Sequence, residues 1–359
     1  MWRTVLACVR AGVPALLIGQ PGVGKTAKIR SYFGHHDFHV EVVSGGNREA
    51  SDFLGLPVER NGAVEYAPLG WAIRCNQARK AVAFLDEMGE NEASFSAMLR
   101  VLQDRAVGDM PLGDHVALLA AMNPADISVS GLHLPGPIAN RMVHLDWQFD
   151  QDEWAAGLLR GFVGTSLAAP EQYLPVQGAA TYATVAGRVA AYLRSDPAAL
   201  APKPPESEAK RGGAWPSPRS WHNAVRVLAQ LPTTDDDAIH LTLCGTVGEA
   251  AAIKFERWSL ENDLYDLPSV LSGAVKVNWT ERGDRLFALT NGLASYGLTD
   301  PNMWTKAIQV LADGAAVRPD TVYPAALDLL RAIPPGQRLP KTAQTAFAEI
   351  LAKIGLVLV

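Results

Sequence analysis

The sequence is short of cysteine, of excess charge and of long apolar runs. Three of its 359 residues are cysteines, 19% are charged, and the formal net charge is −5. Cys8, Cys75 and Cys244 stand far apart without metal-type spacing, which argues against a disulfide framework or a zinc module and favours buried reduced thiols. No apolar run reaches the roughly 18 residues of a membrane span, and the weak negative charge does not suit a nucleic-acid coat. We expect neither a membrane nor a nucleic acid as the main partner.

The length and composition fit a globular protein of several domains. Hydrophobic residues make up 48% of the chain, and a prior of about 150 residues per domain predicts two or three domains. Residues 1–148 alternate apolar with helical segments, whereas the remainder is rich in Ala and Leu at helical spacing. We expect an α/β core over residues 1–148, an all-helical lid over 149–268 and a helical extension over 269–359.

Four short apolar segments in the first part predict the strands of a parallel sheet. They cover residues 15–18, 39–43, 81–85 and 116–122, and each is followed by polar residues. Apolar runs of this length, separated by helices, are typical of strands that are buried on both faces of a doubly wound sheet. In such a sheet the ligand binds beyond the carboxyl ends of the strands.

Two segments between these strands predict β-hairpins inserted into the core. Asn61-Gly62 lies within residues 56–66 between β-prone runs, and Asn-Gly favours the tight turn of a hairpin. A second hairpin is expected around residues 107–115, with Gly113-Asp114 near its turn.

The part of the chain after residue 148 predicts helices and one long loop. Helical periodicity covers residues 152–162, 179–193, 219–231, 239–260 and 344–354. Asp300-Pro301 supplies a cap and a first-turn proline for another helix. Residues 202–216 are rich in proline, glycine and charge, which predicts a flexible loop inside the helical part.

A phosphate-binding loop lies between the first predicted strand and a helix. The segment GQPGVGKT has the pattern GxxxxGK followed by Ser or Thr, the Walker A motif, in the context that it requires. Glycines let backbone amides surround phosphate oxygens, Lys25 adds a charge near the β and γ phosphates, and Thr26 is the expected magnesium ligand. The predicted nucleotide-binding residues are Gly19, Gln20, Pro21, Gly22, Val23, Gly24, Lys25, Thr26 and Ala27. We expect ATP and Mg²⁺ as ligands.

The phosphate loop also bears on the location of the protein. The N-terminal segment MWRTVLACVRAGVPALLIG superficially resembles a signal peptide, but Arg10 interrupts its apolar run and the phosphate loop follows directly. Cleavage there would destroy the ATP site. We therefore expect a cytoplasmic protein.

Acidic and amide side chains follow two other predicted strands. The strand of residues 81–85 runs into Asp86 and Glu87, a form of the Walker B motif. Asp86 is an expected magnesium ligand, and Glu87 is the expected base that polarises the water attacking the γ-phosphate. Asn123, at the end of the strand of residues 116–122, would orient that water, which is the role called sensor 1.

Two arginines are candidates for contact with the transferring phosphoryl group. Arg141 lies at the end of a short predicted helix and would act as an arginine finger on the ATP of a neighbouring subunit. Arg219 follows Ser217 and Pro218, which can cap a helix and occupy its first turn. It would act as sensor 2 and couple the helical lid to the γ-phosphate. The alternative for Arg141 is a surface arginine without a role in catalysis, and the alternative for Arg219 is a simple surface salt bridge.

With these residues in this order, the chain resembles the MoxR branch of AAA+ ATPases, including relatives that act with von Willebrand factor A domain proteins. The matching segments are GQPGVGKT, SDFLG, FLDE, AAMNP, ANRM and PSPRSW, within residues 1 to about 270. Met88-Gly89-Glu90 departs from the Ile-Asn-Arg that often follows Walker B in that family.

The resemblance implies a P-loop αβα core with a helical lid, in which the two hairpins are the helix-2 insert and the pre-sensor-1 insert. It also implies a homo-oligomeric ring, expected to be a hexamer, with ATP bound at subunit boundaries. Members of the family are similar to chaperones in that they remodel or activate partner proteins, so a protein client is expected, with a von Willebrand factor A domain protein as one candidate.

Three functions are open at this stage. The leading hypothesis is an ATP-driven remodeller of a protein client. A nucleic-acid motor of the helix-2-insert clade would use basic hairpins, but the first hairpin carries Glu59, Arg60 and Glu65, and the second carries Asp109 and Asp114 without lysine. A nucleotide-gated scaffold would bind ATP and assemble with little turnover. The client, the ring size and whether sensor 2 acts in its own subunit are also open.

Overall fold

The chain forms two compact units in its computed structural model, which describes residues 1–359 except 125, 129–130, 161–168, 263 and 354–359. The first unit comprises Met1–Val176, Lys203–Val227 and Leu231–Glu249, and the second comprises Gln177–Pro202, Leu228–Gln230 and Ala250–Val359. The domain boundaries expected after residues 148 and 268 remain predictions.

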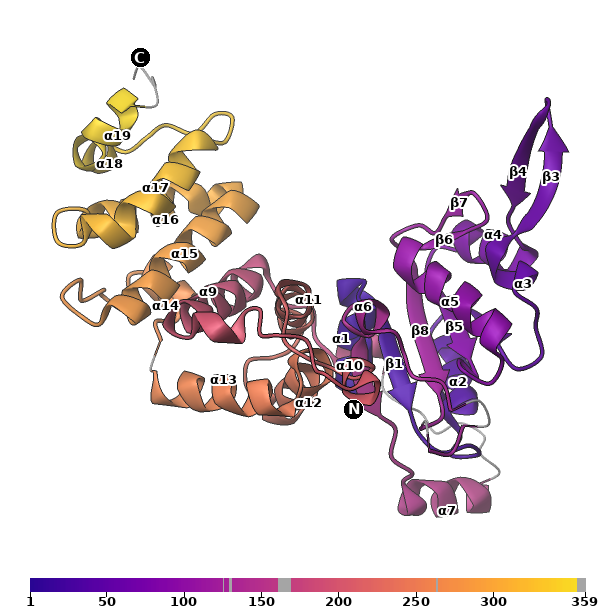
Figure 1. The fold of residues 1–359 in the computed structure, drawn as a ribbon. Helices are drawn as coiled ribbons and strands as arrows, with labels where there is room; N and C mark the ends of the chain where they lie inside the picture. Colours follow the sequence, from indigo (N-terminus) through magenta and orange to yellow (C-terminus); the bar gives the residue numbers. More distant parts are fainter. Residues whose placement is uncertain (125, 129–130, 161–168, 263, 354–359) are drawn as a thin grey trace. The chain divides into compact units, whose positions relative to one another are not determined.

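A five-stranded parallel sheet forms the centre of the first unit (Figure 1). Its strands are β1 (Ala15–Ile18), β2 (His39–Ser44), β5 (Ala81–Asp86), β8 (Val116–Met122) and β9 (Val143–Asp146), in the order β2-β5-β8-β1-β9. Every residue of β5 and β8 is buried, as expected of apolar strands covered on both faces. The predicted α/β fold, a P-loop core with a parallel sheet followed by helical segments, is confirmed.

The strand order brings the polar strand ends together. β8 pairs with β5 on one side and with β1 on the other, so the loops that follow these three strands are neighbours. In this register Ile18 pairs with Met122, and Leu85 pairs with Ala120. The segments that begin at Gly19, Glu87 and Asn123 therefore leave the sheet at the carboxyl ends of its strands, where ligands bind in this fold class.

Helices pack against the sheet through apolar faces. They include α1 (Trp2–Ala11), α2 (Lys25–His35), α3 (Ser51–Leu54), α4 (Gly70–Gln77), α5 (Glu92–Asp104) and α6 (Gly136–Ala139). In α5, Phe95, Met98 and Leu102 recur every three or four residues and are buried in the same core as the strands. Asn91 caps this helix, because its side chain accepts a hydrogen bond from the Ala93 amide at 3.0 Å.

The first hairpin consists of β3 (Leu56–Arg60) and β4 (Ala63–Ala67), and it extends away from the rest of the core in Figure 1. Asn61 and Gly62 form its turn with φ of 52° and 78°. Two successive positive φ angles are those of a type I′ turn, whose twist matches that of the strands. The hairpin predicted from Asn61-Gly62 is thus present.

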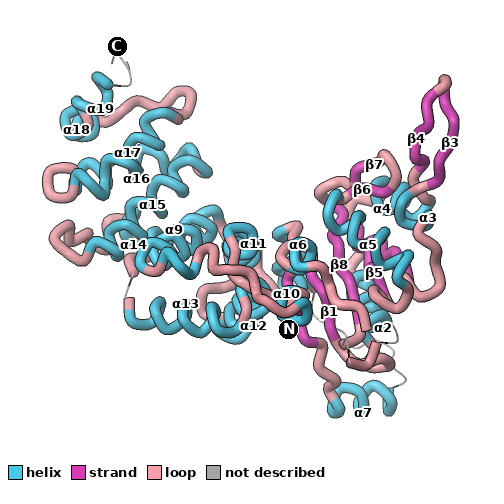
Figure 2. Tube along the Cα trace, viewed as in Figure 1, coloured by secondary structure: helices cyan, strands magenta, loops and turns pink. Residues whose placement is uncertain are grey.

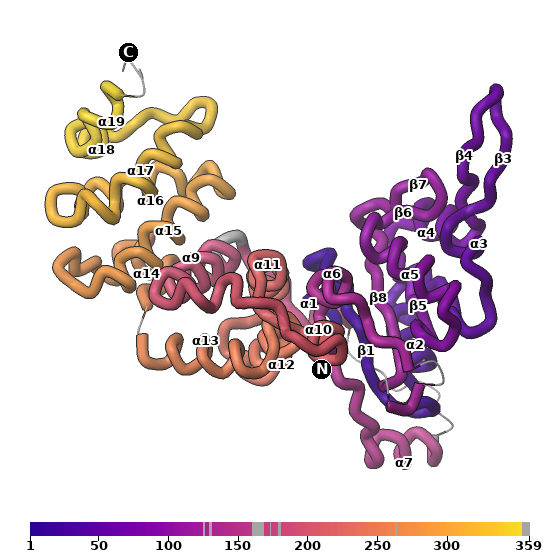
Figure 3. The backbone as a smooth tube through the Cα atoms, in the orientation of Figure 1, coloured from indigo at the N-terminus to yellow at the C-terminus, as the bar shows by residue number. Residues whose placement is uncertain are grey.

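The second hairpin, β6 (Ala106–Val107) with β7 (Met110–Pro111), lies beside the base of the first (Figure 3). Its turn is Gly108-Asp109 and not the expected Gly113-Asp114, because Gly108 supplies the positive φ, 60°, that the turn needs. The Asp109 amide donates to the Tyr66 carbonyl oxygen at 2.9 Å, and the Tyr66 amide donates to Asp109 Oδ2 at 2.7 Å. These bonds join the two hairpins.

The elements after the sheet are helical (Figure 2). They begin with α7 (Gln151–Arg160), α8 (Pro170–Tyr173), α10 (Glu208–Arg211), α11 (Pro218–Leu228) and α12 (Asp236–Val247). The single helix expected over residues 239–260 is two helices, α12 and α13 (Glu249–Glu261), because Gly248 has φ of 82° and ends the first one. The loop expected over residues 202–216 contains the short helix α10.

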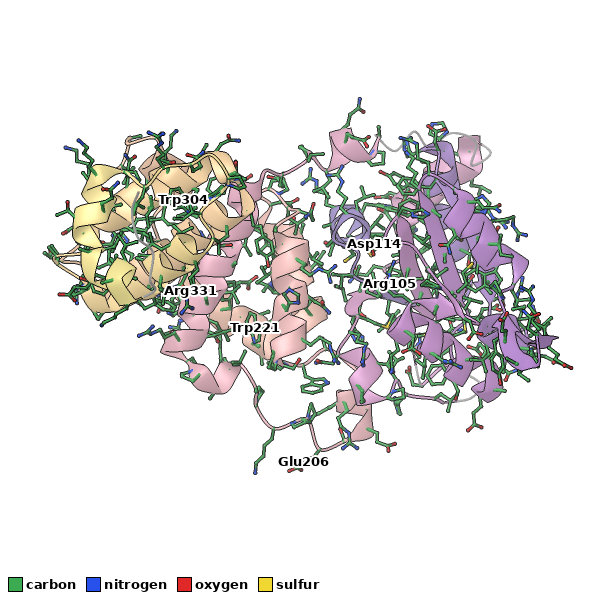
Figure 4. All side chains as sticks on the ribbon, turned by 90° about the horizontal axis from the view of Figure 1, so that it is seen from above. Arg105, Asp114, Glu206, Trp221, Trp304 and Arg331 are labelled. Carbon is green, nitrogen blue, oxygen red and sulfur yellow. The ribbon has the colours of Figure 1, made fainter. Side chains whose placement is uncertain are left out.

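The second unit is a stack of helices with its own core. The main ones are α9 (Ala179–Ser195), α14 (Leu267–Leu271), α15 (Gly283–Thr299), α16 (Pro301–Gly314), α17 (Pro319–Arg331), α18 (Lys341–Ala346) and α19 (Ala348–Lys353). Trp304 is fully buried in this core, and its indole donates to the Leu329 carbonyl oxygen at 2.9 Å (Figure 4). Asp300 caps α16 as predicted. Among the described helices, none is long and apolar enough to cross a membrane.

Candidate functional site

The phosphate loop forms the turn between β1 and α2, and its glycines adopt a backbone that other residues avoid. Gly22 and Gly24 have φ of 78° and 84°, in the left-handed region that favours glycine. A Cβ added at Gly19 would lie 2.8 Å from the Trp147 carbonyl oxygen, so a side chain has no room there. α2 begins at Lys25 and directs the positive end of its dipole at the loop.

The loop encloses one side of a cavity of about 320 Å³. The other side is formed by the ends of β5 and β8, so the strand order itself creates this site. The lining residues are Pro21, Gly22, Val23, Gly24, Lys25, Thr26, Ala27, Asp86, Glu87, Ala121, Met122 and Asn123. The predicted residues 21–27 of the phosphate loop, with Asp86, Glu87 and Asn123, are therefore brought together, whereas Gly19 and Gln20 are not among the lining residues.

Lys25 is held by oxygen acceptors at the edge of the cavity. Its ammonium group donates to the carbonyl oxygens of Gly19 and Gln20, the latter at 3.0 Å, and to Asn123 Oδ1 at 3.2 Å. Three acceptors match the three donors of an ammonium. Burial lowers the pKa of Lys25, and the carboxylates of Asp86 and Glu90 oppose that shift. The predicted residues Gly19 and Gln20 thus contact Lys25 through their backbone.

Thr26 and Asp86 form an oxygen pair inside the cavity. The Thr26 hydroxyl donates a hydrogen bond to Asp86 Oδ2. A hydroxyl and a carboxylate are the hard oxygen ligands that Mg²⁺ prefers beside the phosphates of a nucleotide. The two side chains therefore fit the predicted magnesium ligands.

Glu87 is held in an unusual conformation at the mouth of the cavity. It has a φ of 53°, which costs free energy for a residue other than glycine and is found most often at functional sites. Its carboxylate accepts a hydrogen bond from the Ser44 hydroxyl at the end of β2. A Cβ added at Gly46 would lie 2.8 Å from Glu87 Oε2. The sequence did not single out Ser44 or Gly46, because their proximity to Glu87 depends on the pairing of β2 with β5.

Asn123 is bonded at both ends of its amide group. Its Oδ1 accepts from Lys25, and its Nδ2 donates to Glu90 Oε1 at 2.8 Å. Glu90 is half-buried and directly precedes the cap of α5. The sequence identified Glu90 only as part of a departure from the MoxR pattern.

Arg141 and Arg219 are not among the described residues that line the cavity. Arg141 Nη1 donates to the Pro137 carbonyl oxygen at 2.7 Å, and Arg219 is exposed in the first turn of α11. Burial lowers the pKa of Arg141, and the positive charge of Arg219 lowers it further. The two arginines are thus electrostatic neighbours, away from the phosphate loop of their own chain.

A buried polar network joins the segments that carry these arginines. The Ser217 hydroxyl donates to Asn140 Oδ1. Asn223, in the second turn of the same helix as Arg219, donates from Nδ2 to the Arg141 carbonyl oxygen at 3.1 Å. Buried polar groups whose hydrogen bonds are satisfied fix one arrangement of the surrounding backbone. The network therefore fixes the segment before β9 against the start of α11.

Neither a protein-family model nor a curated protein matches the chain. Among solved structures, it is similar to a protein from Cytophaga hutchinsonii that is provisionally named an ATPase. The two have 16% sequence identity and a TM-score of 0.42, over 69% of this chain and 81% of that one. A similarity this distant does not indicate a function, so the function has to be inferred from the chemistry of the cavity.

The cavity combines the groups needed to bind a polyphosphate and activate a water molecule. Backbone amides, a helix N-terminus and an ammonium group surround the position of an anion. Two side chains with the oxygen atoms that a divalent cation prefers, Thr26 and Asp86, line the same cavity, and so do the carboxylate of Glu87 and the amide of Asn123. These are the components of phosphoryl transfer to water.

Proposed function

We propose that this protein is an ATPase of the MoxR-like AAA+ type, which binds and hydrolyses ATP with Mg²⁺ and uses the energy to remodel or activate a protein client. The observation that carries the proposal is the single cavity lined by the phosphate loop, Asp86, Glu87 and Asn123. Three separate sequence motifs would not converge on one cavity by accident of composition.

Each side chain of the cavity has a part in this chemistry. Lys25 binds the β and γ phosphates, and its contacts with Gly19 and Gln20 give way to phosphate oxygens. Thr26 and Asp86 hold the magnesium ion, which neutralises charge on the phosphates when it is bound. Glu87 accepts the proton of the attacking water, and Asn123 orients that water.

The position of Arg141 supports a site that is completed by a second copy of the chain. β9 is parallel to β1, and its first residue, Val143, pairs with Ala15, the first residue of β1. Arg141 therefore lies at the amino ends of the strands, whereas the phosphate loop follows the carboxyl end of β1. β9 alone is four residues long and spans about 13 Å. An arginine side chain does not cover that distance to its own phosphates, so Arg141 acts on a neighbour's ATP in a ring, which we propose to be a hexamer.

Arg219 belongs to the same surface in this proposal. Its charge adds to that of Arg141, and the Asn140–Ser217 bond fixes the two segments together. Both arginines then face the phosphates of the adjacent copy, with Arg219 as sensor 2.

The β3–β4 hairpin is the proposed contact with the client. Leu56, Val64 and Tyr66 are 50%, 67% and 47% exposed, although they are large apolar side chains. The hydrogen bonds between Tyr66 and Asp109 join this hairpin to the second one, so the two move together. A von Willebrand factor A domain protein is a candidate client.

Substitution of Lys25 and Glu87 tests the ATPase proposal. Lys25→Ala removes the cation that binds the phosphates, so we expect nucleotide binding to be lost. Glu87→Gln keeps the shape of the site but removes the base, so we expect ATP binding to persist while kcat falls about 10²- to 10⁴-fold. Equilibrium binding of a fluorescent ATP analogue and phosphate release measure the two effects.

Lys254→Ala and Glu92→Gln are matched controls, since both side chains are exposed and neither lines the cavity. They should leave binding and turnover unchanged. Turnover by Glu87→Gln at the parent rate would contradict the assignment of the base, and tight ATP binding by Lys25→Ala would contradict that of the phosphate site.

A further inference from the structure

The side-chain amide of Asn123 lies between two groups of opposite charge. Lys25 donates to its Oδ1 at 3.2 Å, and its Nδ2 donates to Glu90 Oε1 at 2.8 Å. An ammonium can only donate hydrogen bonds, and a carboxylate can only accept them. The amide oxygen must therefore face Lys25 and the amide nitrogen must face Glu90, so this Asn has one orientation.

We propose that Glu90 is a positioning residue for ATP hydrolysis, which keeps the amide oxygen of Asn123 directed at the phosphate side of the cavity. This inference rests on the proposed ATPase function. When ATP is bound, the Lys25 ammonium turns to the phosphates and releases Asn123 Oδ1. The Nδ2 group stays on Glu90, so Asn123 presents an acceptor to the attacking water and holds it in line for Glu87.

The backbone around Glu90 is fixed well enough for this role. The Met88 amide donates to the Ala121 carbonyl oxygen at 2.8 Å, which ties the segment after β5 to β8, the strand that carries Asn123. The Met88 side chain is 1% exposed. On the other side of Glu90, Asn91 caps α5. Glu90 is thus held between a buried strand end and a capped helix.

The charge of Glu90 is not aimed at ATP itself. A carboxylate beside a triphosphate repels it, so a residue that only served nucleotide binding would not be acidic at this position. Glu90 instead makes its hydrogen bond to Asn123 from the side opposite Lys25. Removing it should therefore slow the chemical step without weakening ATP binding.

Three substitutions at Glu90 separate these effects. Glu90→Ala and Glu90→Lys remove the acceptor for Asn123 Nδ2, and we expect kcat to fall about 10- to 100-fold, as when a hydrogen bond to a charged group is lost. The affinity for a non-hydrolysable ATP analogue should not fall in any of the three variants, and it should rise in Glu90→Lys, because a charge that repels the triphosphate is replaced by one that attracts it. Glu90→Gln keeps an acceptor oxygen and should restore most of the activity. The exposed Glu92→Ala, two residues along the chain, is the control and should be unchanged.

A double-mutant cycle with Asn123 decides whether Glu90 acts through that residue. In the Asn123→Ala background, Glu90→Ala should cause no further loss of kcat, because the amide that it positions is gone. Parent-like turnover by both Glu90→Ala and Glu90→Lys would overturn the inference, and so would losses that simply multiply in the cycle. If Lys25→Ala and Glu87→Gln also leave hydrolysis unchanged, the proposed ATPase function fails; if they abolish it while Glu90 is neutral, only the role of Glu90 fails.

Discussion

At the scale of single residues, the shape of the cavity depends on small groups beside the charged ones. Glu87 reaches its position with a positive φ, and its carboxylate is held by the Ser44 hydroxyl. Gly46 leaves the space that this carboxylate occupies. A methyl group there would displace the flexible end of Glu87 and leave the backbone in place.

We therefore expect Gly46→Ala to lower kcat at least about tenfold while ATP binding and folding are retained. An added Cβ would approach Glu87 Oε2 to 2.8 Å, closer than van der Waals contact permits, so the carboxylate moves away from the attacking water. Phosphate release and thermal melting measure the two properties. Gly213→Ala is the control, since its Cβ would meet only the Lys210 carbonyl oxygen, at 3.7 Å. A parent-like kcat for Gly46→Ala would contradict this account of how Glu87 is held.

Some residues of the site could be predicted from the sequence, and others could not. Lys25, Thr26 and Asp86 belong to local motifs whose spacing reflects one strand and one turn, so the sequence was enough to group them. Ser44 and Glu90 have no such motif. Their bonds to Glu87 and Asn123 exist only because β2 pairs with β5 and β5 with β8, and pairing between distant segments is not encoded in local spacing.

At the scale of elements, α12 packs unusually close to the edge strand β9. A Cβ added at Gly245 would lie 2.4 Å from the His144 carbonyl oxygen and 2.9 Å from Val143 Cγ1. Glycine within a helix normally lowers helix stability. Position 245 is therefore a glycine because α12 lies so close to β9. This contact holds a helix of the predicted lid segment against the sheet.

We expect Gly245→Ala to destabilise the first unit by about 1–3 kcal/mol, the usual effect of overpacking. The sign of the change in unfolding free energy is informative, because a Gly-to-Ala substitution at an open helical site stabilises by up to about 1 kcal/mol. Gly34→Ala, in α2 with nothing within 4 Å of its added Cβ, provides that comparison. Urea unfolding followed by circular dichroism measures both. An increase in stability for Gly245→Ala would mean that α12 does not pack on β9 in solution.

The element predictions succeeded where periodicity or a turn signal was strong. The four strands expected from apolar runs are present, whereas β9 was not expected, since Val143–Asp146 alternates apolar and polar residues over only four positions. The break at Gly248 was also not expected, because the apolar pattern continues across it and only the φ of 82° reveals the end of the helix. The sequence has two Gly-Asp pairs in the second hairpin segment. The turn forms at Gly108-Asp109, where the φ of 60° and the close approach to the Tyr66 carbonyl oxygen both require glycine.

At the scale of the whole molecule, the parts of the proposed active site lie at opposite ends of the strands, some where the strands begin and some where they end. The phosphate loop lies at the carboxyl ends, and Arg141 lies at the amino ends with Arg219 near it. Side chains at opposite ends cannot meet around one ATP molecule within a single copy. In the proposed assembly, a head-to-tail arrangement of copies brings them together, and such contacts form a ring when the rotation between copies closes.

A mixing experiment tests this arrangement. Arg141→Ala should lower kcat about 10³- to 10⁵-fold, as for other arginine fingers, and Lys25→Ala should be inactive. When the two variants are mixed, an intact phosphate site of one can receive the intact arginine of the other, so activity should return to roughly a quarter of the parent level by random assortment. Mixing each variant with itself is the control. No recovery would mean that Arg141 does not act between copies.

The separation of Arg141 from its own phosphate loop has a consequence for the cell as well as for the mechanism. On the proposed assignment, an isolated molecule can hold ATP without consuming it, and consumption begins only when copies meet. The concentration of the protein would then control its activity. At low expression most copies would bind ATP without hydrolysing it, and a modest rise in expression would increase the turnover per molecule.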